Sequence, residues 1–231
     1  MDGRADLAVH SAKDLPGELP HGLAILGVPE REDPRDVLIG PPGGLEGLPV
    51  GARIGTGSPR RAAQIRLARP DVVCVEIRGN VGTRLDKLTR GEGVDALMLA
   101  AAGLARLGLA PQGLTHLAVT LCVPAPGQGA LAIEGRADRP DLSQVVAILD
   151  DPTTASCVRA ERAFLAALGG GCREPIGALG TTGGGALRLI GFAGSEEGDA
   201  HARGHVVGDV SDAEQLGEEL AATLRARIIS A

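Results

Sequence analysis

Residues 55–61, with the sequence GTGSPRR, carry the strongest chemical signal in the chain. Ser58 and Pro59 are typical N-cap and first-turn residues, so a helix is expected to begin there. The first turn of a helix carries partial positive charge and unpaired N–H groups, yet this one holds Arg60 and Arg61 in place of acidic residues. An anion bound at the helix end would stabilise such a turn. The paired arginines therefore predict an anion site, for which a glycine-rich turn alone would be weak support.

Arg78 and Arg84 follow an expected strand at Val72–Ile77. Open α/β sheets bind ligands beyond the carboxyl ends of their strands, and a guanidinium group binds a carboxylate through two parallel hydrogen bonds. For Arg84 alone, a solvated helix face is the better explanation. With the two arginines of the preceding helix in reach of the same crevice, we predict a ligand that carries several carboxylates.

The charge distribution agrees with this prediction. Residues 53–90 contain eight arginines and one lysine against three acidic residues, although the whole chain has a net charge of −6. A basic island in an acidic protein indicates a site for a small anion, since an acidic surface repels nucleic acid. On charge alone, a solvated helix face explains the island equally well.

Asp14 lies beside Lys13 in the segment HSAKDLP, residues 10–16, directly after an expected strand at Asp6–His10. A carboxylate at this edge of a sheet could donate or accept a proton, or pair with a cationic intermediate. From these residues alone, a surface turn is the preferred explanation.

Cys172 differs from the other three cysteines because it follows a run of glycines and precedes Arg173, which favours the thiolate. A covalent attachment or a nucleophilic role is therefore a hypothesis for it, although no neighbouring His indicates a protease-type pair. The others lie in apolar patterns and are expected to be buried: Cys74, Cys122 and Cys157. Without a CxxC pair, a metal-spaced His or a signal peptide, the sequence predicts a reduced, cytosolic protein with no structural metal.

Short apolar runs alternate with amphipathic stretches, which predicts an α/β protein. Strands are expected at Asp6–His10, Leu23–Val28, Ala52–Gly55, Val72–Ile77, Val94–Leu99, Leu117–Val123, Ala130–Glu134 and Ala186–Phe192. Helices are expected after the caps Ser58 and Asn80, from Asp151 to Gly169, and after a capping box from Ser211 to Glu214. Clusters of Pro and Gly suggest boundaries near residues 29–34, 124–127 and 150–152.

Composition excludes several classes of protein. With 231 residues, 44% of them hydrophobic, the chain is too apolar to be disordered. No apolar run approaches the ~18 residues of a membrane-spanning helix. Two Phe are the only aromatic residues, which argues against a protein that stacks nucleic-acid bases.

Six segments, in order along nearly the whole chain, resemble motifs of the porphobilinogen deaminase (hydroxymethylbilane synthase) family: DGRADLAVHSAKDLP, EREDPRDVLIG, IGTGSPRRAAQI, IRGNVGTRLDKL, PAPGQGALAIE and GGGCREPIGA. The resemblance implies three domains around a cleft. Two are doubly wound and resemble periplasmic binding proteins, and the third is a small α+β domain. The implied domains cover residues 1–30 with 125–148, residues 31–124, and residues 149–231. The resemblance begins within the first domain, so we expect that domain to be incomplete and the strand Asp6–His10 to lie at an exposed edge.

The resemblance also implies the activity. Enzymes of this family are transferases of tetrapyrrole and heme biosynthesis. They join porphobilinogen units head to tail, release ammonia at each step, and build the chain on a dipyrromethane primer. Cys172 matches the cysteine that holds this cofactor by a thioether, and Asp14 matches the catalytic carboxylate. Further cofactor contacts match Ser11, Lys13, Thr56, Ser58, Arg60, Arg61, Arg78 and Arg84. The arginines that bind substrate carboxylates match Arg60, Arg78, Arg84 and Arg106.

The implied partner is porphobilinogen, bound by a cytoplasmic monomer without metal, nucleic acid or membrane. Two other hypotheses stay open. The chain could be a carboxylate-binding module without catalysis, or an inactive fragment of the enzyme whose start at Met1 is misassigned. The module predicts binding without a covalent adduct, and the fragment predicts weak hydrogen-exchange protection near residues 5–28.

Overall fold

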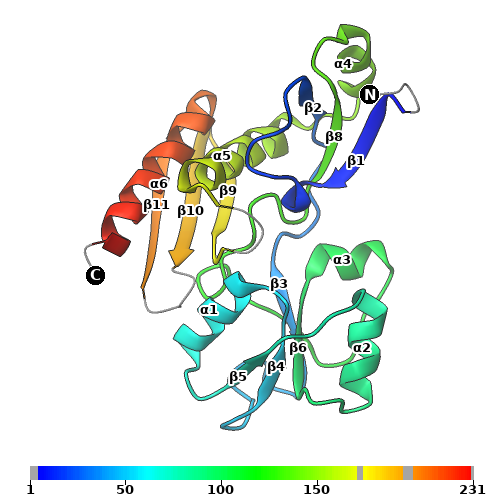
Figure 1. Cartoon of the computed structure of the whole chain (residues 1–231), viewed down its shortest axis with the longest axis vertical. Helices are drawn as coiled ribbons and strands as arrows, with labels where there is room; N and C mark the ends of the chain where they lie inside the picture. Colours follow the sequence, from blue (N-terminus) through cyan, green and yellow to red (C-terminus); the bar gives the residue numbers. More distant parts are fainter. Residues whose placement is uncertain (1–4, 171–173, 195–199, 230–231) are drawn as a thin grey trace.

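The computed structural model describes residues 5–170, 174–194 and 200–229. Its strands form three separate sheets, and in Figure 1 the central sheet lies at the bottom, the N-terminal sheet at the upper right and the C-terminal sheet at the left. The N-terminal sheet has the order β1-β8-β2, the central sheet β5-β4-β6-β3-β7 and the C-terminal sheet β11-β10-β9. Helices pack on the central and C-terminal sheets, so the chain is an α/β protein, as the sequence predicts.

The N-terminal sheet is assembled from two distant parts of the chain. β1 (Leu7–Ser11) and β2 (Leu23–Gly27) both pair antiparallel with β8 (Leu131–Arg136), which lies between them. Among the described strands β1 has no second neighbour, and Val9 on it is 65% exposed, as expected for a sheet edge. A 3-10 turn, Ala12–Asp14, follows β1 directly and places Asp14 at the end of the strand.

The central sheet creates the edge at which the arginines lie. β4 (Arg53–Gly55) pairs parallel with β5 (Val73–Val75) and β6 (Ala96–Ala100), and the helices α1 (Pro59–Ala68) and α2 (Val81–Thr89) make the crossovers. The carboxyl ends of these strands therefore meet at one edge, where both helices begin. β3 (Asp36–Ile39) pairs antiparallel with β6 and with β7 (Leu114–His116).

Side chains of the central sheet alternate between its two faces, and helices or loops bury both faces. Ile54 and Met98 pack with Ile65 of α1 on one face. Leu97 and Leu99 pack on the other face with α2 and with α3 (Ala101–Arg106). Every residue of β6 is buried, which explains why this strand reads as an unbroken apolar run.

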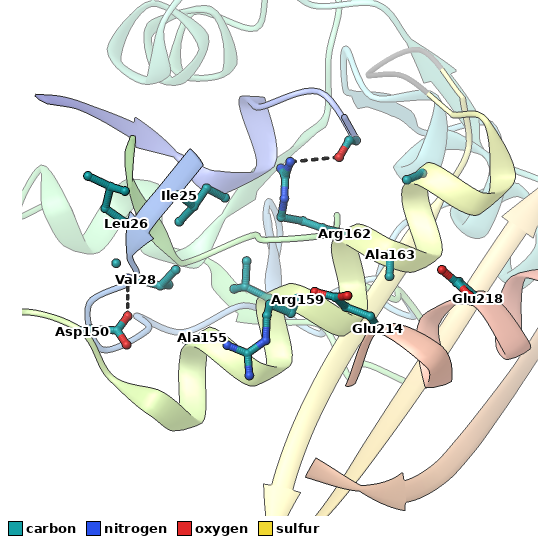
Figure 2. Close-up of a pocket in the computed structure, with 14 residues that line it drawn as sticks. Ile25, Leu26, Val28, Asp150, Ala155, Arg159, Arg162, Ala163, Glu214 and Glu218 are labelled. Carbon is teal, nitrogen blue, oxygen red and sulfur yellow. Dashed lines mark hydrogen bonds between the residues drawn. The ribbon is translucent and has the colours of Figure 1, made fainter. Parts of the chain in front are cut away.

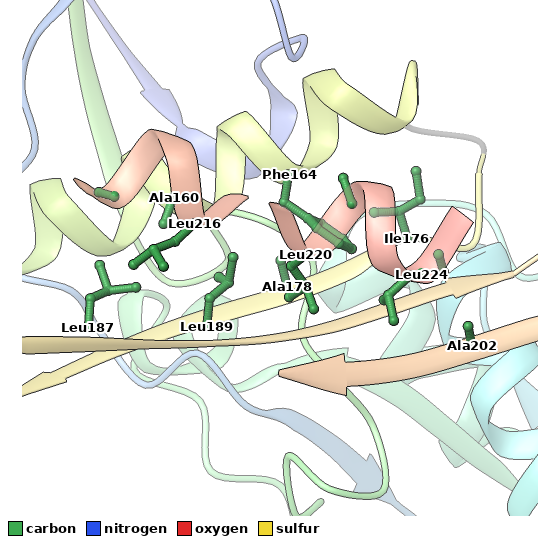
Figure 3. Packing of buried hydrophobic residues seen from close by; sticks show 13 residues of the cluster. Ala160, Phe164, Ile176, Ala178, Leu187, Leu189, Ala202, Leu216, Leu220 and Leu224 are labelled. Carbon is green, nitrogen blue, oxygen red and sulfur yellow. The ribbon is translucent and has the colours of Figure 1, made fainter. Parts of the chain in front are cut away.

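In the C-terminal sheet, β9 (Gly177–Gly183), β10 (Ala186–Gly194) and β11 (His201–Asp209) carry α5 (Pro152–Leu168) and α6 (Ala213–Ile229) on one face. Figure 3 shows Phe164 of α5 and Leu220 of α6 pointing into the core between helices and sheet. The expected ends of α5 are confirmed: Asp151 accepts a hydrogen bond from the Thr154 amide at 2.6 Å, and Gly169 has a left-handed φ of 73°.

Two predictions of local structure are wrong. The strand expected at Leu117–Val123 does not form. The strand nearby is β7, at Leu114–His116, and residues 117–123 form turns in which the Leu121 and Cys122 amides donate to the Ala118 carbonyl. Cys122 is nevertheless buried, so the apolar run reflects burial and not extended backbone. The last helix begins at Ala213, after a 3-10 turn at Val210–Asp212, because Ser211 donates its amide and hydroxyl to Asp209 and forms no capping box.

Five elements lack the signals used above: β3, β9, β11, α3 and α4 (Pro140–Val146). β3 begins with a buried Asp, and β9 and β11 are rich in Gly. α3 follows β6 without a side-chain cap. No helix in the described part of the chain is long and apolar enough to span a bilayer.

Candidate functional site

A cavity of about 490 Å³ lies where the three sheets approach one another. It is bordered by the loop after β1, the start of α1, one arginine of α2, the segment before β8, and the residues on either side of the undescribed positions 171–173. Its charged and polar lining consists of Lys13, Asp14, Ser58, Arg60, Arg61, Arg84, Gln128 and Glu174. Cations outnumber carboxylates in this lining, so the cavity suits an anionic ligand.

Asp14 and Lys13 enter the cavity from the 3-10 turn after β1. The turn is held by the Ala12 amide, which donates to the Ala130 carbonyl at 3.0 Å, and by close packing against Gly127. A Cβ on Gly127 would lie 2.9 Å from the Ala12 carbonyl carbon, and Gly127 has a φ of 75°. Asp14 is exposed to the cavity, where its carboxylate could exchange a proton with a ligand.

Lys13 is a cation with no paired carboxylate. Its side chain makes no hydrogen bond or ion pair with any residue that the structure describes, although the charges of Asp14 and Asp36 act on it at longer range. Burial, with the neighbouring guanidinium of Arg61, lowers the pKa of Lys13 to about 8. A bound carboxylate would reverse this shift, so Lys13 is placed to respond to an anion.

Arg60 and Arg61 lie in the first turn of α1, which begins as expected. Ser58 caps the helix by accepting a hydrogen bond from the Arg61 amide at 3.4 Å. Both arginines line the cavity, but both are almost fully buried, with 3% and 6% of their surface exposed. They bind Asp36 of β3: Nη1 of Arg60 donates to Oδ2 at 2.6 Å, and Nε of Arg61 donates to Oδ1 at 2.8 Å.

Asp36 thus supplies a negative charge that the sequence argument assigned to a ligand. Burial alone would raise the pKa of Asp36, but the two guanidinium groups outweigh burial and hold the pKa well below its usual range. Gln128 also donates to Asp36, at 3.0 Å. Sequence reasoning missed both Asp36 and Gln128, whose signal was a charged residue in an otherwise apolar strand and a Gln between two glycines.

The arginines of the α2 region occupy different places. Arg84 is partly buried in the cavity lining, and its Nε donates to the Gly79 carbonyl at 2.7 Å. Burial and the nearby Arg61 lower the pKa of Arg84. Arg78 is exposed, pairs with Glu76 at 2.8 Å, and lies outside the cavity lining. The structure therefore brings Arg84, but not Arg78, to the buried arginine pair.

The remaining candidate residues lie beside the cavity or outside the description. Arg106 at the end of α3 donates to the Gly129 carbonyl at 2.7 Å. Ser11 precedes the 3-10 turn, and the buried hydroxyl of Thr56 accepts from the Ser58 amide at 3.1 Å. None of the three lines the cavity. Cys172 lies outside the described residues.

Glu161 of α5 fastens the segments that surround the cavity. Its carboxylate, which is fully buried, binds Arg31 through two hydrogen bonds of 2.6 and 3.0 Å. It also accepts from the backbone amides of Gly127 at 2.6 Å and Gly180 at 2.8 Å. The parts of the chain near β2, β8 and β9 are therefore joined at one buried carboxylate, a junction that sequence reasoning missed.

A second cavity, of about 420 Å³, lies between β2, α5 and α6 (Figure 2). Arg162 of α5 lines it and donates from Nη2 to the carbonyl oxygens of Pro16 and Gly17, each at 2.9 Å. This pair of hydrogen bonds ties α5 to the loop that follows Asp14. Its other charged lining residues are Asp150, Arg159, Glu214 and Glu218.

The other cysteines take no part in the first cavity. Cys122 and Cys157 are buried as expected, whereas Cys74 is only partly buried. Burial raises the pKa of Cys122 to about 12 and that of Cys157 to about 11, so both stay protonated near neutral pH. Among the described residues, no three His, Cys, Asp or Glu side chains cluster in a way that could hold a metal ion.

Comparison with known proteins identifies the family. Residues 1–144 match the family model described as porphobilinogen deaminase, dipyromethane cofactor binding domain, and residues 155–226 match the model of the porphobilinogen deaminase C-terminal domain. A porphobilinogen deaminase from Pelobacter propionicus is 48% identical over 98% of this chain and 73% of its own length. One from Roseiflexus castenholzii is 49% identical over 96% of this chain and 73% of its own length.

A likeness to a solved structure is distant. An amino acid ABC transporter substrate-binding protein from Streptococcus pneumoniae is 16% identical, with a TM-score of 0.33, over 59% of this chain and 60% of its own. A likeness at this level adds nothing to the assignment. The two family models and the sequence relatives together cover nearly the whole chain, and the chain belongs to the porphobilinogen deaminase family.

Proposed function

We propose that this chain joins porphobilinogen units head to tail into the linear tetrapyrrole hydroxymethylbilane. The observation that carries the proposal is the cavity in which Asp14 lies among Lys13, Arg60, Arg61 and Arg84. Each porphobilinogen has two carboxylates and one aminomethyl group. Such a substrate needs cations for its acid groups and one carboxylate beside the reacting carbon.

In the proposed reaction, the bond between the methylene carbon and the amine nitrogen of porphobilinogen breaks, and ammonia leaves. The methylene carbon forms a bond to the free α-carbon of the acceptor pyrrole, which loses one proton to the Asp14 carboxylate once Asp14 has protonated the leaving amine. Asp14 protonates the leaving amine and stabilises positive charge on the pyrrole nitrogen. Its place at a fixed turn, in a cavity shared with the arginines, would hold the carboxylate beside the reacting groups.

The residues of the cavity fit a dipyrromethane cofactor. Its carboxylates would form ion pairs with the unpaired Lys13 and with the partly buried guanidinium of Arg84. When bound, this group supplies the pyrrole α-carbon on which the product grows. Lys13, Ser58 and Arg84 would hold it from the described part of the cavity, with Cys172 as the attachment point.

The other family-matched residues complete the proposal. Ser11, Thr56 and the buried Arg60 and Arg61 would support the cofactor. Arg78 and Arg106 would bind substrate carboxylates from outside the present lining, beside Arg60 and Arg84. The three sheets would be the cores of three domains, at residues 1–30 with 125–148, 31–124 and 149–231, the first two similar to periplasmic binding proteins. We propose a cytoplasmic monomer, whose net charge of −6 disfavours nucleic acid as a partner.

The proposal is tested by incubating the purified chain with porphobilinogen and measuring ammonia, the tetrapyrrole and the intact mass. We expect turnover, and a dipyrromethane adduct that maps to Cys172 and is absent from Cys172→Ala. Asp14→Asn should keep the adduct and lose turnover by at least about 100-fold, the range for removal of a general acid. Normal turnover by Asp14→Asn contradicts its catalytic role. Ligand binding without an adduct or ammonia identifies a carboxylate-binding module instead.

A further inference from the structure

Arg203 lies on β11 of the C-terminal sheet, but its hydrogen bonds go to a different part of the chain. Its Nη2 donates to the Leu121 carbonyl at 2.8 Å and to Oε1 of Gln64 at 2.9 Å, and its Nη1 donates to the Thr120 carbonyl. The guanidinium carbon also lies 5.2 Å from the ring centre of the buried Phe192, a cation–π contact. One side chain therefore ties the C-terminal sheet to α1 and to the crossing segment, residues 118–128, which leads from β7 to β8.

Gln64 relays this contact toward the first cavity. It is fully buried, and its Oε1 accepts from the Val123 amide at 2.8 Å as well as from Arg203. Its Nε2 donates to the Val123 carbonyl at 3.1 Å and to the Arg60 carbonyl at 3.3 Å. Because a buried amide needs its partners, Gln64 fixes Val123 only while its own orientation is held.

Val123 in turn orients a guanidinium group that lines the cavity. Nη1 of Arg60 donates to the Val123 carbonyl at 2.7 Å and to Asp36 at 2.6 Å. The crossing segment then continues from Val123 to Ala125, Pro126 and Gln128, all of which line the same cavity. Arg203 itself is not part of the lining.

We propose that Arg203 is a positioning residue: from outside the cavity it holds, through Gln64 and Val123, both the crossing segment and the guanidinium of Arg60. A guanidinium group is suited to this role because its planar fork donates to several acceptors at once. Hydrogen bonds weaken steeply when their distance or angle departs from the preferred geometry, so a displaced guanidinium group binds a carboxylate less tightly. The inference rests on the proposed function only for the identity of the ligand, porphobilinogen.

The test compares Arg203→Gln with Arg188→Gln in the full chain. Arg188 is a matched control, since it is exposed on the neighbouring strand β10 and its side chain has no hydrogen bond or ion pair with the described residues. Hydrogen exchange is measured without porphobilinogen, and KM and kcat are measured by ammonia release. For Arg203→Gln we expect exchange about tenfold faster in the crossing segment and at the C-terminal end of α1, with the C-terminal sheet still protected.

We also expect KM to rise about tenfold for Arg203→Gln while kcat changes less, because misplaced hydrogen-bond donors bind the substrate carboxylates less tightly. A purely structural role would lower the folded fraction and hence kcat, and would leave KM unchanged. Unchanged KM, or unchanged exchange in the crossing segment, overturns the inference. If Arg203→Gln does not fold, Arg203→Lys, which keeps the stem and the charge but not the fork, is judged by the same outcomes. Failure of the proposed function is recognised separately, by a wild-type chain that releases no ammonia, and the exchange measurement then still tests Arg203.

Discussion

The first cavity has two cationic regions that differ in how their charge is balanced. Arg60 and Arg61 are almost fully buried and share the carboxylate of Asp36. Lys13 and Arg84 are less buried, and no carboxylate among the described residues pairs with them. Both regions were expected from the sequence to bind an anion, but only Lys13 and Arg84 lack an ion pair with a described carboxylate.

This difference separates arginines with a mainly structural role, of which Arg60 is also proposed to contact substrate, from cations whose charge is free to bind a ligand. Two buried guanidinium groups without a counterion would be very costly, so the fold supplies Asp36 for them. Their donors toward the cavity are then limited, and they serve as a rigid, positively polarised wall. Lys13 and Arg84 keep their charge available, and a ligand with several carboxylates would be bound mainly by them. The following predictions test this separation.

Asp36→Asn should have the largest effect, on stability. It leaves Arg60 and Arg61 buried with no carboxylate, and breaking a buried pair in this way costs about 3–5 kcal/mol of unfolding free energy. The measurement is urea unfolding followed by circular dichroism. Asp33→Asn is the control, because Asp33 pairs with the exposed Arg35 and exposed pairs are worth only about 0–1 kcal/mol. Equal loss in the two variants would show that the buried pair has no special structural weight.

Arg84→Gln should weaken binding and leave stability almost unchanged. A hydrogen bond to a charged group contributes about 1.5–3 kcal/mol, so we expect KM for porphobilinogen to rise roughly 10- to 100-fold. Arg90→Gln is the control, since Arg90 lies at the end of the same helix and pairs with Glu92 at 3.0 Å. If Arg84→Gln binds porphobilinogen normally, Lys13 and Arg84 are not the main binding region.

In the Cys172→Ala variant, which should carry no cofactor, porphobilinogen binding should weaken as the pH rises through about 8, the pKa of Lys13 when no anion is bound. The folded pKa is lowered from 10.5, so the charged form is disfavoured until a carboxylate binds to it. Affinity is therefore full below pH 8, and we expect it to fall by up to about tenfold between pH 7 and 9. Titrations at both pH values measure this, and Lys13→Met should remove most of the dependence. An equal dependence in Lys13→Met would assign the titration to another group.

Arg78→Gln should have the smallest effect on the isolated chain. The side chain is exposed and pairs only with the exposed Glu76, so the urea midpoint should not shift measurably. Because Arg78 is proposed to bind a substrate carboxylate from outside the present lining, KM should rise, but by less than for Arg84→Gln. An unchanged KM would remove Arg78 from the proposed binding residues.

Much of the local structure could be predicted from the sequence. Ser58, Asn80 and Asp151 cap helices by accepting hydrogen bonds from amides three residues away, so the residues that define each cap lie close together in the sequence. Gly169 ends α5 because glycine adopts a left-handed φ without strain. Leu216 and Leu220, four residues apart in the sequence, lie on the buried face of α6, although the predicted start of that helix was wrong.

The sequence predicted which types of side chain line the site better than it predicted their burial and their partners. Lys13, Asp14, Ser58 and Arg84 do lie in one cavity. Arg78, by contrast, is exposed and apart from them. The partners that set the charge and position of the lining, Asp36 and Glu161 among them, gave no local signal, because each acts on segments distant along the chain.

By itself, the sequence determined which family this chain belongs to, the types of its reactive side chains and the caps of its helices. Only the tertiary structure decided which cations are balanced. Arg60 meets Asp36 across 24 positions of sequence, and Arg203 meets Gln64 across 139. Such pairs depend on how sheets and helices pack, since a short-range sequence pattern does not indicate a partner that is distant along the chain. The electrostatics of the cavity are therefore a property of the fold, built on residues that the sequence alone could name.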